Sequence, residues 1–513
     1  MANGNTEIPT KAKQAVVVVH GQGEQRPMAT LRAFAETVWV RQNPGEYELD
    51  PKKYRLWSKP DNVTGNLELR RLTTNSLEIT RDDGPVRLRT DFFEFYWQHL
   101  MPGNQWSHFV TWIQPLIRTP FSSLPKALEI IWAPLQLTLY ATILVGASLG
   151  LIALLAWARL LGANPIGVSV GTWLSAVMEK DYFWLALVFA GVLLVAAVLV
   201  VAVVMRFLVH YFGDAARYLN AEPRNVAART TIRSELLGLL RTLQDHDDYT
   251  RIVLVGHSLG SVIAYDALSF LWSEYSSPKD QEGTSSRPSG PSVGGIAEVE
   301  RAQHAARQVE DARKSGDDTQ LTTALQAYED ARRHLAVWLQ GQTPAWKITD
   351  FITLGSPLTY ADILVATNPI AFNQAVDDRE LPTSPPQLEQ VRGERVFTYP
   401  HFKPGRDDAD TETWYFHHAA VFAATKWTNL YFGVRNLVRG DILSGPVRRL
   451  FGLGVLDRRV WCDFRWGTSR HNRYWESDTT SRDSTTPRPE KALRDVLNLA
   501  QKEAPVSDTP VSV

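Results

Sequence analysis

Short apolar runs recur along the chain, and a turn and a helical stretch follow each of the first two. Residues 14–19 (QAVVVV), 251–256 (RIVLVG) and 348–355 (ITDFITLG) are rich in β-branched and apolar side chains. Continuous apolar runs of this length predict strands buried on both faces, and the helical patterns between them predict βα units. The sequence therefore predicts an α/β domain with a mostly parallel central sheet flanked by helices.

Two much longer apolar segments interrupt this alternation. Residues 130–158 contain 29 successive positions without a formal charge, and residues 182–205 contain another 24. Each segment is long enough to cross a hydrocarbon core of about 30 Å as a helix, so together they predict a transmembrane hairpin. Five Lys and Arg residues lie close outside the hairpin and two lie inside it, which favours a cytoplasmic location for the rest of the chain. The alternative is a pair of buried core helices. The expected protein is thus a two-pass integral membrane protein with the bilayer as partner.

A second insertion is predicted further along the chain. Residues 276–295 are a Ser/Pro/Gly linker, and residues 296–340 are Ala-rich and helical, with a break at 315–316. Because this helical stretch is polar over most of its length, it favours docking of a protein partner over a role as a lid. The expected organisation is a first part of the α/β domain at 14–125, the transmembrane hairpin at 130–205, a central part at 206–275, a linker and helical insertion at 276–345, a C-terminal part at 346–476, and a largely disordered tail at 477–513 with one helix near 490–502.

Composition excludes several other classes of protein. The 513 residues include 54 Lys and Arg and 55 Asp and Glu, and this near-zero net charge argues against a nucleic-acid partner. The single Cys462 excludes an internal disulfide framework and a Cys-based zinc site. No His and carboxylate spacing typical of metal ligands occurs, so neither a metal nor a cofactor is expected. The polar start of the chain is unlike a secretory signal, which favours a reducing compartment.

The pattern G-x-S-x-G occurs twice, at 146–150 and at 256–260. The first copy lies inside the first uncharged segment, where small residues spaced by four suit close helix packing. The second copy follows a predicted strand and precedes a predicted helix, which is the setting of a nucleophile elbow. Ser258 is therefore the candidate nucleophile. The alternative is a plain turn in which Ser258 caps the helix.

A serine nucleophile needs a base, and the base needs an acid that orients it. In this architecture the chain order is Ser, then Asp or Glu, then His. His471 follows the last predicted strand and is the candidate base. Asp441, which follows the WTNLYF run and precedes His471 by 30 residues, is the candidate acid. Asp362 and Asp463 are its competitors.

Acyl transfer also needs donors aimed at the developing oxyanion. The backbone N–H of Leu259, directly after the candidate nucleophile, is one. The backbone N–H of Gln22, in the glycine-rich turn after the first predicted strand, is the other. The alternative for that turn is a simple glycine turn, and it fits neither G-x-G-x-x-G nor the P-loop pattern. The glycines of the elbow and of the oxyanion loop are Gly256, Gly260, Gly21 and Gly23.

Taken together, VVVVHGQGEQ, RIVLVGHSLGSVIAYDAL, TLGSPL, RGDILSGP and HNRYW resemble the α/β-hydrolase superfamily of lipase and esterase type. The resemblance implies a mostly parallel sheet, a Ser-His-Asp triad and hydrolysis of carboxylic esters. A transmembrane hairpin departs from typical members, and an anchor near a bilayer suggests a lipid-derived ester. The alternatives are an acyltransferase or thioesterase with the same triad, and a catalytically silent membrane scaffold.

Overall fold

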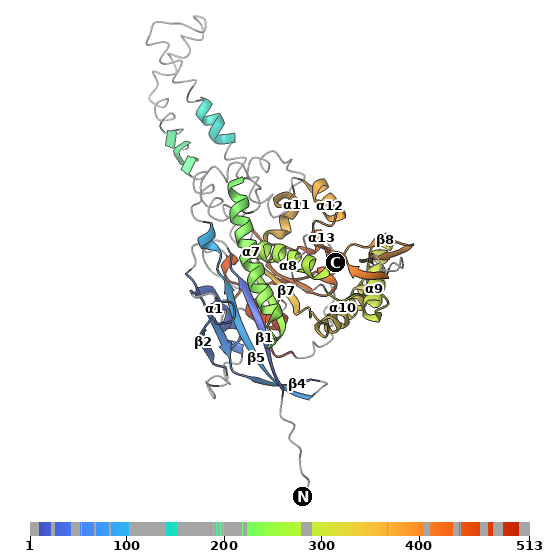
Figure 1. The fold of residues 1–513 in the computed structure, drawn as a ribbon. Helices are drawn as coiled ribbons and strands as arrows, with labels where there is room; N and C mark the ends of the chain where they lie inside the picture. The colour runs from blue at the N-terminus through green and yellow to red at the C-terminus, as the bar shows by residue number, and fades with distance from the viewer. Residues whose placement is uncertain are drawn as a thin grey trace, which may run out of the picture. The chain divides into compact units, whose positions relative to one another are not determined.

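The chain divides by its internal contacts into two compact units (Figure 1). One unit consists of Met1–Gly103 with Arg217–Val513, and the other of Asn104–Ala216. The computed structural model describes residues 10–21, 26–42, 52, 54–65, 68–81, 84–101, 140–148, 150, 188, 191–192, 194–196, 198–199, 218, 223–278, 290–366, 368–403, 411–433, 441, 443–461, 470–475 and 486–501.

A nine-stranded mixed sheet forms the centre of the larger unit. Its six parallel strands run in the order β13-β12-β7-β6-β1-β5, and antiparallel strands β3, β2 and β4 complete one edge. The strands are β1 (Thr10–Val19), β2 (Leu56–Pro60), β3 (Arg70–Thr74), β4 (Leu77–Arg81), β5 (Gly84–Phe95), β6 (Tyr249–His257), β7 (Ile348–Leu354), β12 (Lys426–Phe432) and β13 (Leu456–Val460). The predicted α/β domain with a mostly parallel central sheet is confirmed.

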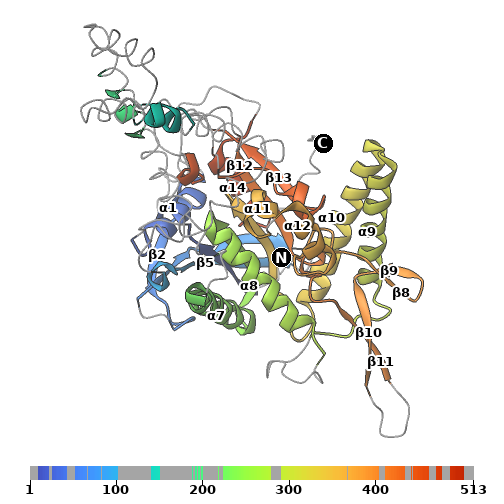
Figure 2. The ribbon, with the colours of Figure 1, turned by 90° about the horizontal axis from the view of Figure 1, so that it is seen from above.

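Helices cover both faces of this sheet, which is why its central strands are apolar on both sides (Figure 2). One face packs against α1 (Ala29–Val38) and α14 (Pro489–Leu497), and the other against α7 (Pro223–Asp245) and α8 (Leu259–Ser276). Shorter elements surround this core. They are η1 (Val40–Gln42), η2 (Gln98–Leu100), η4 (Pro357–Tyr360), α11 (Ala361–Leu364), α12 (Pro369–Asp377), η5 (Val421–Ala423), α13 (Arg448–Phe451) and η6 (Arg470–Asn472).

A helical pair occupies the stretch expected to form an insertion. Helices α9 (Ala297–Ser315) and α10 (Asp318–Gln340) pack side by side and are separated at Gly316, whose φ of 72° ends α9 in the left-handed region. Two small hairpins belong to the same half of the chain. They are β8 (Glu389–Val391) with β9 (Glu394–Val396), and β10 (Thr398–Lys403) with β11 (Thr411–Phe416).

The prediction of a two-pass integral membrane protein is contradicted. Across the described ranges, no helix combines the length and the apolar character that a membrane span requires. A spanning helix needs about 20 consecutive apolar residues, whereas the long helices α7 and α10 carry several charged side chains. The expected spans at 130–158 and 182–205 lie mostly outside the described residues. The bilayer partner and the cytoplasmic placement derived from those spans lose their basis.

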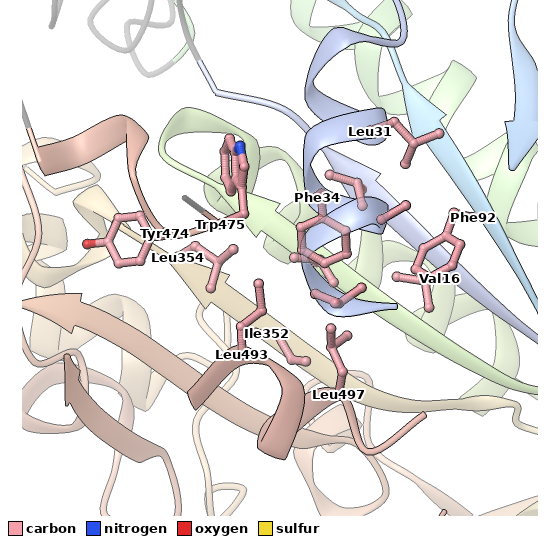
Figure 3. Close-up of a cluster of buried hydrophobic side chains, with 14 of the residues drawn as sticks. Val16, Leu31, Phe34, Phe92, Ile352, Leu354, Tyr474, Trp475, Leu493 and Leu497 are labelled. Atoms are coloured by element: carbon pink, nitrogen blue, oxygen red, sulfur yellow. The ribbon is translucent and has the colours of Figure 1, made fainter. Parts of the chain in front are cut away.

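The final helix is part of the hydrophobic core. Leu493 and Leu497 of α14 pack with Phe34 of α1, Ile352 of β7 and Trp475 (Figure 3). Burying each leucine contributes about 1.5–3 kcal/mol. This helix is the one expected near 490–502, so the stretch from 477 onward contains a core element and is more than a largely disordered tail.

Candidate active site

Ser258 lies in the turn that joins β6 to α8. Its backbone has φ 53° and ψ −129°, a strained conformation for a residue with a side chain. Two hydrogen bonds hold the turn in place: Ser258 N–H donates to the Leu354 carbonyl at 2.9 Å, and Ser261 N–H donates to the Ser258 carbonyl at 2.9 Å. Ser258 is therefore presented at the carboxyl end of the parallel strands, where ligand sites of α/β sheets lie.

The two glycines of this turn are required by backbone crowding. A Cβ atom at Gly256 would lie 2.4 Å from Ser261 Cα, and one at Gly260 would lie 2.3 Å from the Val19 carbonyl oxygen. Neither contact leaves room for a methyl group, because the obstructing atoms belong to the backbone. Gly256 thus lets β6 run into the first turn of α8, and Gly260 lets α8 pack tightly against the end of β1.

His471 and Asp441 form a buried pair, although they are 30 residues apart. His471 Nδ1 donates to Asp441 Oδ2 at 2.9 Å, and the two residues are only 3% and 2% exposed. This hydrogen bond requires the tautomer with a proton on Nδ1, which leaves Nε2 as the basic nitrogen. An imidazole oriented in this way is suited to accept a proton from a nearby hydroxyl group.

The Asp441 carboxylate is held by several donors. Leu443 N–H donates to Oδ1 at 3.0 Å, and the Tyr474 hydroxyl donates to Oδ2 at 3.0 Å. Burial would raise the pKa of Asp441, but attraction to His471 and the hydrogen bonds from His471, Ser444 and Tyr474 outweigh it and lower the pKa. Asp441 therefore stays charged while its oxygens face protein donors.

Gly355 and His257 connect this pair to the serine turn. Gly355 directly follows the carbonyl that accepts from Ser258 N–H, and a Cβ on it would lie 3.2 Å from both Asp441 Oδ2 and His471 Cε1. His257, the neighbour of Ser258, hydrogen-bonds through Nε2 to the His471 carbonyl at 2.8 Å. The three candidate triad residues thus converge on one small region at the same edge of the sheet.

The competing acid Asp362 has a different partner. Asp362 accepts from Arg449 Nη2 at 3.0 Å in an ion pair. Asp463 lies outside the described residues. Within the part of the chain that the structure describes, no group of three or more His, Cys, Asp or Glu side chains could hold a metal ion.

The loop after β1 meets the serine turn at Gly21. A Cβ on Gly21 would lie 2.7 Å from both Ser258 Cβ and His257 Nδ1, so only glycine fits. Gln22 and Gly23 lie outside the described residues. Leu259, the other expected oxyanion donor, is the first residue of α8, where backbone N–H groups have no partner within the helix.

Three residues of the site were missed by the motif analysis: Tyr474, His257 and Gly355. Tyr474 lies in HNRYW and Gly355 in TLGSPL, both of which carried the family resemblance without a role for these residues. A signal was available for Gly355, because a glycine directly after a buried strand often marks close backbone approach. No local signal separates Tyr474 from an ordinary core tyrosine.

The second copy of the motif has different surroundings. Ser148 is exposed, and its hydroxyl donates to the Leu144 carbonyl four residues earlier at 2.8 Å. A Cβ on Gly146 or Gly150 would meet no atom within 4 Å. Ser148 makes an ordinary hydrogen bond of a helical serine.

Comparisons with protein-family models, with curated proteins and with solved structures each found no match to this chain. The fold and the geometry of the site are therefore the observations on which a function can be based.

Proposed function

We propose that this chain is a serine hydrolase of the α/β-hydrolase type that cleaves carboxylic esters through an acyl-enzyme. Ser258 is the nucleophile, His471 the general base and acid, and Asp441 the residue that orients His471. The observation that carries the proposal is the buried Asp441–His471 hydrogen bond beside a serine in a strained turn between strand and helix. If the Asp441–His471 hydrogen bond only stabilised the fold, a serine in a strained backbone conformation would not be needed beside it.

In the first half of the reaction, His471 Nε2 takes the proton of Ser258 as Oγ attacks the ester carbonyl carbon. The tetrahedral intermediate carries a negative oxygen, which Leu259 N–H and Gln22 N–H stabilise. The intermediate collapses and the bond to the leaving oxygen breaks. The leaving alcohol takes the proton from the His471 imidazolium, and the acyl group stays on Ser258.

In the second half, water replaces the alcohol. His471 takes one proton from the water as its oxygen attacks the acyl carbon, and the second tetrahedral intermediate forms. It collapses to a carboxylic acid, and Ser258 Oγ leaves with the proton held by His471. Throughout both halves Asp441 remains a carboxylate, which stabilises the imidazolium at the moments when it carries charge.

The proposed substrate is a carboxylic ester without the restriction to lipids that the sequence suggested. The lipid expectation rested on a membrane anchor, and that anchor is contradicted. The proposed carboxylic ester is supported by the triad chemistry together with the family resemblance. Acyl transfer and thioester hydrolysis would use the same residues, so a substrate panel distinguishes them.

The test is covalent labelling of the full-length chain with a fluorophosphonate probe, which reacts with activated serines. We expect wild-type protein to be labelled and Ser258→Ala to be unlabelled. Ser148→Ala, the matched control in the second copy of the motif, is expected to label as wild type does. A folded wild-type protein that resists the probe, or labelling of Ser258→Ala at the wild-type rate, would refute the proposal and favour a silent scaffold.

Turnover then defines the reaction. Short-chain esters, long-chain esters and acyl-thioesters are offered to the wild-type chain, with water or an added alcohol as acceptor. We expect free carboxylic acid from an ester as the main product. A product that appears only with the alcohol, or only from thioesters, would replace ester hydrolysis by one of the two related reactions.

A further inference from the structure

His257 directly precedes Ser258 and is buried between the parts of the site. Its Nε2 lies 2.8 Å from the His471 carbonyl oxygen. Its ring centroid lies 5.0 Å from that of His471 and 4.8 Å from that of Trp475, to which it is nearly perpendicular. On another side, Nδ1 faces Gly21, where a Cβ would approach it to 2.7 Å.

The protonation of His257 follows from these partners. A carbonyl oxygen only accepts, so Nε2 must carry a proton. Burial, together with the nearby His471, lowers the pKa of His257 to about 3, so the ring is neutral and Nδ1 has no proton. Nδ1 accepts no hydrogen bond from the described residues. His257 is thus a neutral donor, and its hydrogen bond among the described residues goes to the backbone of His471.

We propose that His257 is a positioning residue, which fixes the backbone of His471 over the serine turn while Asp441 fixes its ring. This inference rests on the proposed hydrolase function. An imidazole fixed only by a hydrogen bond at Nδ1 can rotate about that bond. A second hydrogen bond, from His257 to the His471 carbonyl oxygen, fixes the backbone and so defines where Nε2 of His471 lies. Such placement matters because a misplacement of about 1 Å costs roughly 100-fold in rate.

Neutrality is also needed for this role. When His471 takes the serine proton it becomes a cation, 5.0 Å from the His257 ring. A second cation at that distance would oppose the proton transfer. A neutral donor anchors the His471 backbone without adding this repulsion.

The test uses three variants of the full-length chain. A glutamine at 257 can place its amide nitrogen near the position of imidazole Nε2, so His257→Gln keeps the donor. His257→Asn places its donor near the position of Nδ1, and His257→Met keeps the bulk without a donor. Because some variants could fold poorly, the thermal unfolding midpoint of each is measured beside kcat and KM on a short-chain ester.

We expect kcat to fall about 10–100-fold in His257→Met and His257→Asn, with KM within about twofold of wild type. His257→Gln is expected to recover most of the lost kcat, and labelling by the fluorophosphonate probe is expected to slow in the same order. If His257 had only a structural role, the substitutions would lower the unfolding midpoint, but kcat would not differ between the His257→Gln and His257→Asn variants.

Two results would overturn the inference in an active wild-type protein. One is a His257→Met variant that keeps kcat within about twofold. The other is an equal loss of kcat in the Gln and Asn variants that follows their unfolding midpoints. If the folded wild type neither turns over esters nor reacts with the probe, the proposed function itself fails and the inference fails with it.

Discussion

The same five-residue pattern has two different outcomes in this chain. At 146–150 the serine hydroxyl is satisfied by its own helix, and the glycines have open space around them. At 256–260 the serine has a positive φ. A Cβ atom added to either glycine would lie only 2.3–2.4 Å from a backbone atom. The comparison teaches that the same five letters take different backbone conformations, and that of the two copies the one between a strand and a helix forms the tight turn of the candidate site. The surroundings of the serine, rather than its flanking letters, determine what it can do.

The largest expected difference between the two copies is in turnover. Ser258→Ala is expected to lower kcat for ester hydrolysis by about 10⁴–10⁶-fold, because the nucleophile is removed. Ser148→Ala is expected to leave kcat unchanged. Steady-state kinetics on a short-chain ester measures both, and a comparable loss in the two variants would end the distinction.

The glycines of the two copies are expected to differ in how much they contribute to the free energy of unfolding. Gly260→Ala places a methyl group on the Val19 carbonyl, so we expect a loss of about 4 kcal/mol or more in the free energy of unfolding. Gly146→Ala has open space in a helical stretch and is expected to be neutral or to stabilise by up to about 1 kcal/mol. Chemical denaturation measures the two values. A Gly260→Ala protein as stable as wild type would show that the turn can relax.

Tyr474 sharpens the comparison, because the Ser148 copy has no such supporting network among the described residues. Tyr474→Phe removes a hydrogen bond to the Asp441 carboxylate, worth about 1.5–3 kcal/mol for a charged acceptor. We expect kcat/KM to fall about 10–100-fold. Tyr328→Phe is the matched control: it removes a buried tyrosine bond to the Phe422 carbonyl, away from the site. That control is expected to lower stability while kcat stays at the wild-type value.

The smallest effect is a pH dependence of stability that belongs to the Ser258 copy. Burial lowers the pKa of His257 to about 3 and of His20 to about 4, from 6.5. At these two histidines the unfolded chain binds more protons than the native state below pH 6.5, so the stability that they contribute falls as pH drops through this range. Between pH 7 and pH 5.5, His257→Gln is expected to lose about 1 kcal/mol less than wild type. Equal losses in denaturation experiments at the two pH values would contradict a neutral buried His257.

Much of the local structure could be predicted from the sequence. The strand ending at His257, the turn at Ser258 and the helix starting at Leu259 agree with the apolar run, the two glycines and the helical stretch predicted after them. The pairing of Asp441 with His471 agrees with the chain order expected for a triad, and the geometry brings these two residues together. The expectation of a two-pass membrane protein is contradicted, because no described helix has the length and apolar character of a span, although the sequence contains two uncharged segments long enough for one.

The sequence by itself determined the class of fold and the elements that carry the candidate triad, because strands, turns and helices depend on residues near one another in the chain. Only the tertiary structure decided which side chains support that triad. Tyr474 reaches Asp441, His257 reaches the His471 backbone, and Gly355 lies beneath both triad partners. These contacts join residues up to 214 positions apart. They depend on the strand order of the sheet, which no local pattern encodes.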